Sequence, residues 1–170
     1  MECELYYALL FGQGVEGEVC TTEERVMATS ATEEIRELVQ RDIDEVWNEG
    51  NYEIIDELYA EDFVHHDPAY PGEIQGREAQ KEFVRMYNTA FPGEPAITID
   101  ELVVEGDMVT LRWTGRGTHE NEFMGVEPTH REVEVAGMSM ARVRDGEIAE
   151  MWSNYDALGL LSQIGAVEFA

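Results

Sequence analysis

The residues with the clearest potential for chemistry lie in the stretch EMWSNYD, residues 150–156. If this stretch is a strand, Trp152, Asn154 and Asp156 share one face, because side chains alternate along a strand. A large apolar tryptophan favours the inward orientation, so we expect Asp156 to lie in an apolar cavity. Burial there raises the pKa of a carboxyl group and makes it a competent general base near neutral pH. The same spacing also allows Asp156 to cap a helix that begins at Ala157.

His119 is a second candidate for chemistry. It has the same parity as Leu111 and Trp113, so it faces the same cavity if the strand runs without a bulge. Histidine titrates near neutral pH and can hydrogen-bond a substrate carbonyl or an enolate. The spacing leaves open a second interpretation, in which His119 ends the strand and faces solvent.

Two adjacent histidines, His65 and His66, precede Asp67. Neighbouring strand residues point to opposite faces, so these two cannot bind one metal ion together without a kink. One of them is expected to line the pocket and the other to lie outside it. We therefore predict no metal site and no cofactor.

Arg142 has two possible roles. It can reach inward and pair with Asp156, which would lower the pKa of that carboxyl, or it can pair with acids on the surface. An arginine between two aspartates would suggest epoxide hydrolysis, but no second strand aspartate completes that set. The remaining candidates for the core or the pocket wall are Tyr59, Phe63, Tyr87, Met138 and Met140.

The elements that position these residues are predicted from hydrophobic periodicity. Three helices come first, from apolar residues at helical spacing over residues 29–51, 52–63 and 77–91. Ser30 and Glu33 form a candidate capping box in the first of them.

From residue 96 the period changes to alternation. Long strands are predicted over residues 96–106, 107–123, 131–146 and 147–156, followed by a short closing helix over residues 157–165. Helices followed by an antiparallel meander predict an α+β domain with three helices on one face of a strongly curved sheet. Such a sheet leaves a cone-shaped cavity between itself and the helices, where function is expected.

Composition limits the class of protein. The chain has 170 residues, which suits one domain; we assign residues 27–170 to it and residues 1–26 to a poorly ordered extension. The net charge is −26, and Lys81 is the single lysine. This composition favours a cytoplasmic protein from a high-salt interior. It argues against nucleic acid and anionic membranes as partners, because no basic patch is present.

Further limits come from the cysteines and the first residues. Cys3 and Cys20 both precede the domain, which excludes a thiol nucleophile or a disulfide within it. The apolar stretch LYYALLFG, residues 5–12, is too short to span a membrane and lacks the basic flank of a secretory signal.

Residues 117–165 contain a series of motifs: Gly117-Thr118-His119, Pro128-Thr129, Arg142 with Asp145-Gly146-Glu147-Ile148, Trp152 with Asp156, and Leu160 with Gln163 and Gly165. In these motifs the chain resembles the SnoaL-like polyketide cyclase family, also called ester cyclases, within the nuclear transport factor 2 and ketosteroid isomerase-like superfamily. The resemblance covers roughly residues 30–165, including WNEGNYEIIDELYAEDFVHHDP. His130 stands where the family usually has glycine, and Glu147 where it usually has lysine.

The resemblance implies a cone-shaped α+β barrel and an intramolecular aldol reaction without metal or organic cofactor. It also implies that Asp156 is the acid–base group. The expected function is thus acid–base chemistry next to a carbonyl of a hydrophobic small molecule: cyclisation, isomerisation or dehydration. The alternatives are a non-catalytic ligand-binding or dimerisation module and an epoxide or ester hydrolase. A homodimer is expected, because sheets of this kind leave an exposed outer face.

Overall fold

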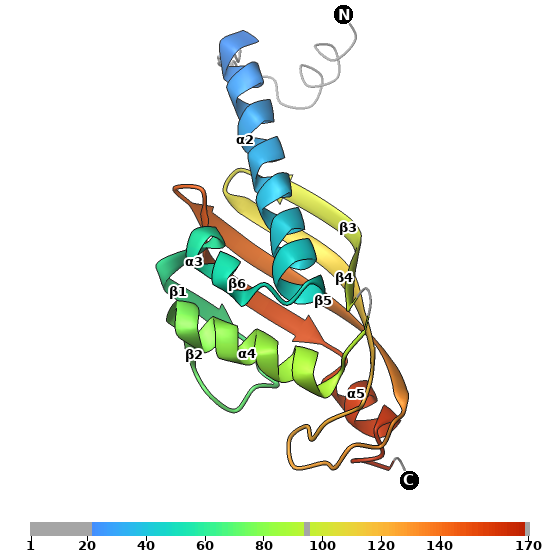
Figure 1. Ribbon diagram of the computed structural model, residues 1–170. Coiled ribbons are helices and arrows are strands. Elements are labelled where there is room, and N and C mark those ends of the chain that lie inside the picture. Colours follow the sequence, from blue (N-terminus) through green and yellow to red (C-terminus); the bar gives the residue numbers. More distant parts are fainter. Residues whose placement is uncertain (1–21, 94–95, 169–170) are drawn as a thin grey trace, which may run out of the picture.

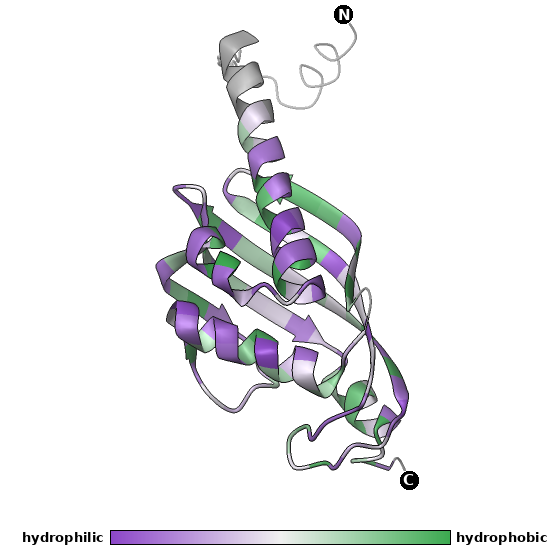
Figure 2. Ribbon diagram, in the orientation of Figure 1, coloured by the Kyte–Doolittle hydropathy of each residue, from purple (hydrophilic) through white to green (hydrophobic). Residues whose placement is uncertain are grey.

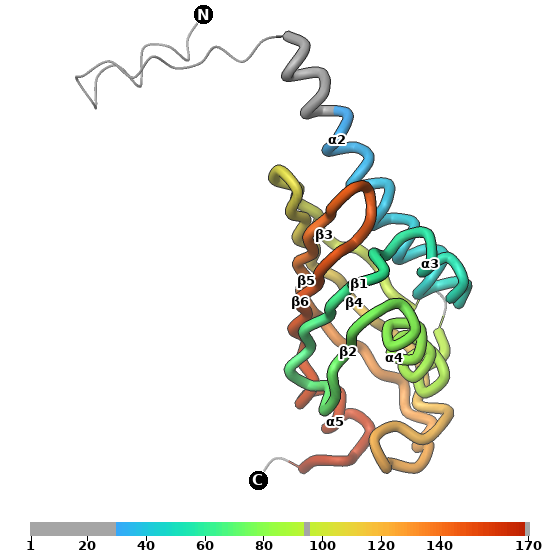
Figure 3. The backbone as a smooth tube through the Cα atoms, turned by 90° about the vertical axis from the view of Figure 1, so that its left-hand side faces the viewer, coloured from blue at the N-terminus to red at the C-terminus, as the bar shows by residue number. Residues whose placement is uncertain are grey.

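The computed structural model describes residues 22–93 and 96–168. Their backbone forms one six-stranded sheet, in the order β2-β1-β6-β5-β4-β3, with helices packed on one face (Figures 1 and 3). The helices are α2 (Thr22–Arg41), the π-helix η1 (Asp42–Asn48), the 3₁₀ helix η2 (Tyr52–Ile54), α3 (Ile55–Leu58), α4 (Gly76–Ala90) and α5 (Ala157–Gln163). The strands are β1 (Tyr59–His66), β2 (Ile74–Gln75), β3 (Ile97–Glu105), β4 (Met108–Thr118), β5 (Glu132–Arg144) and β6 (Glu147–Tyr155).

The α+β class is confirmed. Strands β3 to β6 form the predicted antiparallel meander, whereas β1 runs parallel to β6 and makes the sheet mixed. The sheet is open, with β2 and β3 at its two edges. In the part of the chain that the structure describes, no helix is long and apolar enough to cross a membrane.

Two predictions about the helices were wrong. The predicted helix over residues 52–63 ends at Leu58, and Tyr59–His66 forms strand β1 because it pairs with both β2 and β6. Long-range strand pairing thus overrides the local helical pattern. Ser30 does not cap a helix, because α2 already begins at Thr22 and the Ser30 hydroxyl donates to Glu34. Of the predicted extension, residues 1–21 lie outside the described residues, and the rest belongs to α2.

The core lies between the concave face of the sheet and the helices. Figure 2 shows polar residues interspersed with apolar ones along α2 and α4, as amphipathic helices require. Their apolar sides cover the inward residues of the sheet, such as Val109, Ala141 and Ile148, which are buried. On β5 every second residue from Val133 to Ala141 points inward.

Gly137 makes room for the indole of Trp113. A Cβ atom at this position would lie 2.3 Å from the Trp113 ring, closer than any real contact. Gly137→Ala is therefore expected to displace Trp113 and to lower the free energy of unfolding by about 1–3 kcal/mol. The measurements are urea denaturation and the tryptophan emission spectrum. Ala136→Val, on the exposed side of β5, is the matched control and should leave both unchanged; equal losses in the two variants would contradict the close approach.

Candidate functional site

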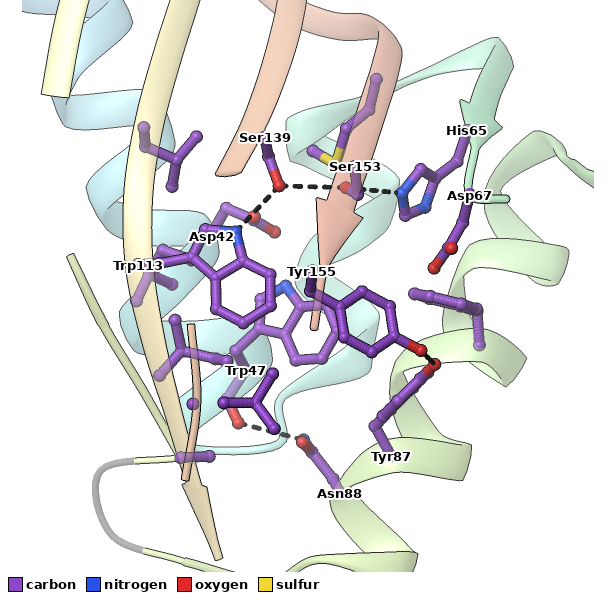
Figure 4. A pocket seen from close by; sticks show the side chains of 18 of the residues that line it. Asp42, Trp47, His65, Asp67, Tyr87, Asn88, Trp113, Ser139, Ser153 and Tyr155 are labelled. Carbon is purple, nitrogen blue, oxygen red and sulfur yellow. Dashed lines mark hydrogen bonds between the residues drawn. The ribbon is translucent and has the colours of Figure 1, made fainter. Parts of the chain in front are cut away.

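A cavity of about 130 Å³ lies between the sheet and the helices (Figure 4). Its wall is mostly apolar, and aromatic side chains contribute much of it. Polar side chains interrupt this wall, so the cavity has the makeup of a small-molecule site: an apolar body with a few polar groups that orient a ligand. They are Asp42, His65, Asp67, Asn88, Arg116, Ser139, Ser153 and Tyr155, together with the indole of Trp113 and the hydroxyl of Tyr87.

Asp42 is the most unusual of these groups. It is the first residue of the π-helix η1 and is only 3 % exposed. The Tyr59 hydroxyl donates a hydrogen bond of 2.7 Å to Oδ1, and no described residue hydrogen-bonds Oδ2. Burial raises the pKa of Asp42 to about 7, against the opposing effect of the Tyr59 hydrogen bond. A carboxyl with this pKa can take up or release a proton near neutral pH.

His65 is a buried, neutral histidine on the cavity wall. Its Nε2 lies 2.9 Å from the Ser153 hydroxyl and its Nδ1 lies 3.2 Å from Oε1 of Gln80. Burial lowers the pKa of His65 to about 4, because the charged imidazolium loses hydration. The ring therefore acts as a hydrogen-bonding group at neutral pH rather than as a cation.

Two serines on neighbouring strands continue from His65. Ser153 on β6 and Ser139 on β5 are register partners, and their hydroxyl oxygens lie 3.0 Å apart. The indole Nε1 of Trp113 donates to the Ser139 hydroxyl over 3.0 Å (Figure 4). These contacts make a connected row of polar groups across the sheet side of the cavity.

Tyr87 and Tyr155 form a hydroxyl pair elsewhere on the wall. Their oxygens lie 2.6 Å apart, with Tyr87 on α4 and Tyr155 at the end of β6 (Figure 4). Burial raises the pKa of both hydroxyls and also raises the pKa of Asp67, which lies near them. The two tyrosines therefore remain protonated and can serve as hydrogen-bond donors.

The expectation that Asp156 lies in the apolar cavity is wrong. Asp156 is exposed and caps α5, where its Oδ1 accepts a hydrogen bond of 2.8 Å from the Gly159 N–H. The inward residues of β6 are Met151, Ser153 and Tyr155, which line the cavity. The helix-capping alternative is the one that the structure bears out.

Trp152 and Asn154 are likewise on the outer face of β6, contrary to the expectation. Trp152 is only half-buried there because its neighbours cover it: His66 stacks on its ring at 5.4 Å, and the Arg142 guanidinium lies over it at 5.8 Å. A tryptophan can thus lie on an outer face when flat side chains shelter it.

Met138, Met140 and Arg142 also lie on the outer face and not on the pocket wall. Met138 and Met140 are 55 % and 40 % exposed. Arg142 pairs with Glu150 and Asp107 and has no contact with Asp156, so its surface interpretation holds. These residues are at the outward-pointing positions of β5, which alternate with the inward-pointing positions Val133, Val135, Gly137, Ser139 and Ala141.

His119 is buried but does not line the cavity. Strand β4 ends at Thr118, so the alternation that predicted its direction stops before it. The ring stacks on Phe91 at 5.2 Å, and its Nδ1 accepts from the Thr129 N–H and lies 3.0 Å from the Thr129 hydroxyl. Its Nε2 has no hydrogen-bond partner among the described residues.

The adjacent histidines are divided between the two sides of the sheet. His65 lines the cavity, whereas His66 lies outside and its Nε2 is 3.0 Å from Glu150. Of the other candidates, Trp113 and Tyr87 lie on the wall, and Tyr59 lies behind it and holds Asp42. Among residues 22–93 and 96–168, no group of three or more His, Cys, Asp or Glu could hold a metal ion.

The sequence prediction missed Asp42, Asp67, Ser139, Ser153 and Tyr155. A signal for Asp42 is visible in the first helix. Asp42 follows Leu38 by four residues and precedes Val46 by four, so it interrupts an apolar helical stripe with a carboxyl group. For Ser139, Ser153 and Tyr155 the missing information was which face of each strand the helices cover.

Comparison with known proteins supports the fold. The family model for SnoaL-like polyketide cyclases matches residues 37–164. Among curated proteins, none matches this chain.

Solved structures of similar proteins include three from Streptomyces species. TsrD of Streptomyces laurentii is 27 % identical, with 79 % of this chain and 96 % of TsrD covered at a TM-score of 0.69. IdmH of Streptomyces antibioticus, a candidate polyketide cyclase, is 34 % identical over 76 % of this chain and 97 % of IdmH, with a TM-score of 0.63. AclR of Streptomyces galilaeus, a candidate hydroxylase, is 26 % identical over 81 % of this chain and 98 % of AclR, with a TM-score of 0.69. This chain therefore belongs to the SnoaL-like polyketide cyclase family and has its nuclear transport factor 2-like fold.

Proposed function

We propose that this protein transfers a proton next to a carbonyl group of a small, mainly apolar compound, in an aldol-type cyclisation, an isomerisation or a dehydration. The observation that carries the proposal is the Asp42 carboxyl, buried on the wall of an apolar cavity, with one oxygen held by Tyr59 and the other without a hydrogen-bond partner among the described residues. Family membership supports the same class, because related proteins are named as polyketide cyclases.

In this proposal Asp42 is the acid–base group. Its carboxylate takes a proton from the carbon next to the carbonyl, and the electron pair of that C–H bond moves to give an enolate. In a cyclisation the enolate carbon then bonds to a second carbonyl carbon, and the resulting alkoxide takes the proton back from Asp42. Each proton is returned, so the cycle needs no added acid or base.

The Tyr87–Tyr155 pair is suited to hold the carbonyl oxygen. One of the two hydroxyl hydrogens forms the bond of 2.6 Å between them, which leaves the other free for a ligand. A donor placed at the carbonyl oxygen strengthens its hydrogen bond as negative charge develops on the enolate. This lowers the barrier to proton removal by Asp42.

A non-catalytic ligand-binding module of the same fold is the second candidate. Asp156 occupies the position that the family resemblance marks as acid–base, yet it is an exposed helix cap. That observation favours binding without chemistry unless Asp42 takes over the role.

The experiment that separates these candidates is deuterium exchange into 2-tetralone, an apolar ketone with acidic α-protons. In D₂O at neutral pD, the protein is expected to accelerate loss of the α-proton NMR signal above the buffer rate, with saturation as ketone concentration rises. Exchange at the buffer rate, with 2-tetralone shown to bind, would favour the binding module. Serum albumin at the same concentration controls for exchange at nonspecific apolar sites.

We also propose that the outer face of the sheet pairs with a second copy of the chain. Exposed Met138 and Met140 lie beside Trp152 on adjacent strands, which gives an apolar strip on this face. Sedimentation velocity should show a dimer, and Met140→Glu should shift it toward monomer. A monomer at every protein concentration would contradict this proposal.

A further inference from the structure

A continuous chain of buried hydrogen bonds runs from the indole of Trp113 to the carboxyl of Asp42. The serine row and His65 form its first part (Figure 4). Gln80 and Tyr59 form its second part. An indole N–H only donates hydrogen bonds and a carboxylate only accepts them, so both ends have fixed chemistry above pH 7, where Asp42 is ionised. The position of every hydrogen between the two ends can therefore be derived.

From the Asp42 end, each donor is determined by its neighbour. Tyr59 donates to the carboxylate, so its oxygen is left to accept from Nε2 of Gln80 over a long contact of 3.5 Å. This orientation turns Oε1 of Gln80 toward Nδ1 of His65, at 3.2 Å. An amide oxygen only accepts, so Nδ1 of His65 carries the hydrogen and Nε2 does not.

The rest of the chain follows from this tautomer. Since Nε2 of His65 is bare, the Ser153 hydroxyl must donate to it. Ser139 in turn donates to Ser153, and its own oxygen accepts from Trp113. The direction derived from the carboxylate is thus compatible with the indole N–H, which can only donate to Ser139.

We propose that this chain makes the serine pair an acceptor-only surface, so that the cavity selects a ligand with a hydroxyl or another hydrogen-bond donor at that wall. Both serine hydrogens take part in the chain of hydrogen bonds, and each oxygen keeps one lone pair that no described residue uses. Ser139 and Ser153 both line the cavity, so those lone pairs are open to a ligand. A ligand that places only a carbonyl or an ether oxygen there would face acceptors without a donor.

Together with the Tyr87–Tyr155 pair, this gives the ligand two polar ends. The tyrosine pair donates and the serine pair accepts, which fits an apolar hydroxy-carbonyl compound. The inference adds a substrate class to the proposed function. It rests on that function only where it treats the bound ligand as the substrate. Binding at the serine pair is measurable without turnover.

The first test is the tautomer of His65, by ¹⁵N NMR of the uniformly labelled protein at pH 9, where Asp42 is ionised and His65 is neutral, with His65→Gln to assign the signals. The expected result is a protonated Nδ1 and an unprotonated Nε2. A protonated Nε2 would reverse the serine bonds and overturn the inference. The tautomer is measured in the unaltered protein, so this result does not depend on how a variant folds.

The second test compares phenol with anisole, which differ in one donor hydrogen. Phenol is expected to bind about three- to tenfold more tightly, the size of one net hydrogen bond. In Ser153→Ala the Ser139 hydrogen loses its acceptor and turns to the ligand, so the preference should fall to about one. Ser162→Ala, a serine of α5 that does not line the cavity, should keep the preference.

Equal binding of phenol and anisole, or a preference that survives Ser153→Ala, would overturn the inference. Its failure is distinguishable from failure of the proposed function. If the protein prefers phenol but does not accelerate 2-tetralone exchange, the acceptor-only serine pair is supported and the proposed proton transfer is contradicted. If it accelerates exchange but does not prefer phenol, the proton transfer is supported and the acceptor-only serine pair is contradicted.

Discussion

Replacing Asp42 with asparagine is expected to slow the protein-catalysed exchange of 2-tetralone α-protons by about 10²–10⁴-fold, the contribution of a positioned general base. Asparagine keeps the shape of the side chain and an oxygen that can accept from the Tyr59 hydroxyl, but it cannot take up a proton. The measurement is the initial exchange rate in D₂O by proton NMR, at matched protein and ketone concentrations.

Asp156→Asn is the matched control for this result. Asparagine caps helices about as well as aspartate, so α5 should keep its N-terminal hydrogen bond to Gly159 and the exchange rate should stay within about twofold. The opposite pattern, with exchange lost in Asp156→Asn and kept in Asp42→Asn, would return the acid–base role to the position that the family resemblance indicates.

The second large effect is on stability as a function of pH. The pKa of Asp42 rises from 3.8 in the unfolded chain to about 7 in the folded protein. The stability that this carboxyl contributes is therefore fully present below pH 3.8 and is lost as the pH rises through 7. The shift corresponds to a difference of about 4 kcal/mol between the two limits.

Asp42→Asn removes this dependence because the amide is neutral throughout. Relative to the unaltered protein, the free energy of unfolding of the variant is thus expected to rise by about 4 kcal/mol between pH 3.5 and pH 8. At pH 8 the free energy of unfolding of Asp42→Asn exceeds that of the unaltered protein by less than this, because an unpaired amide N–H₂ in the cavity costs about 1–3 kcal/mol. Urea denaturation of both proteins at each pH, in one salt concentration, gives the difference.

The comparison between two proteins is needed because His65 titrates in the opposite sense. Its folded pKa is lowered from 6.5 to about 4, so its contribution to stability is present above pH 6.5 and is lost as the pH falls through 4. This contribution is common to both proteins and cancels in the difference. Parallel stability curves for the two proteins would show that Asp42 has an ordinary pKa.

The fold could be predicted from the sequence because its periodic segments are long. Apolar residues at helical spacing before residue 92 and alternating residues after residue 96 indicate helices followed by a meander, as the structure shows. Short segments were less predictable. Tyr59–His66 has a pattern that suits either element, and only its pairing with β6 and β2 decides for a strand.

The site could be predicted only in part, because alternation gives two faces without saying which is inward. The large size of Trp152 favoured the face of Trp152 as the inward face of β6. The helices instead cover the face that carries Ser153 and Tyr155. Trp152 remains sheltered on the outside through His66 and Arg142, which lie far from it in sequence or on another strand. One wrong orientation for β6 misplaced Asp156.

Asp42 was hidden for a different reason. The helix around Asp42 was predicted, but one aspartate cannot be distinguished by residue type alone in a chain with 37 acidic residues. Its position on the apolar stripe with Leu38 and Val46 was the informative feature. The burial of that stripe against the sheet then gives the carboxyl its raised pKa.

The most direct measurement of the central claim is the pH titration of the Asp42 carboxyl carbon by ¹³C NMR, with Asp42→Asn to assign the signal. A midpoint near pH 7 is expected, because the carboxyl lies in an apolar cavity with one hydrogen-bond donor. A midpoint at or below the ordinary value of 3.8 would mean a well-solvated or strongly hydrogen-bonded carboxylate and would contradict the assignment of Asp42 as the acid–base group.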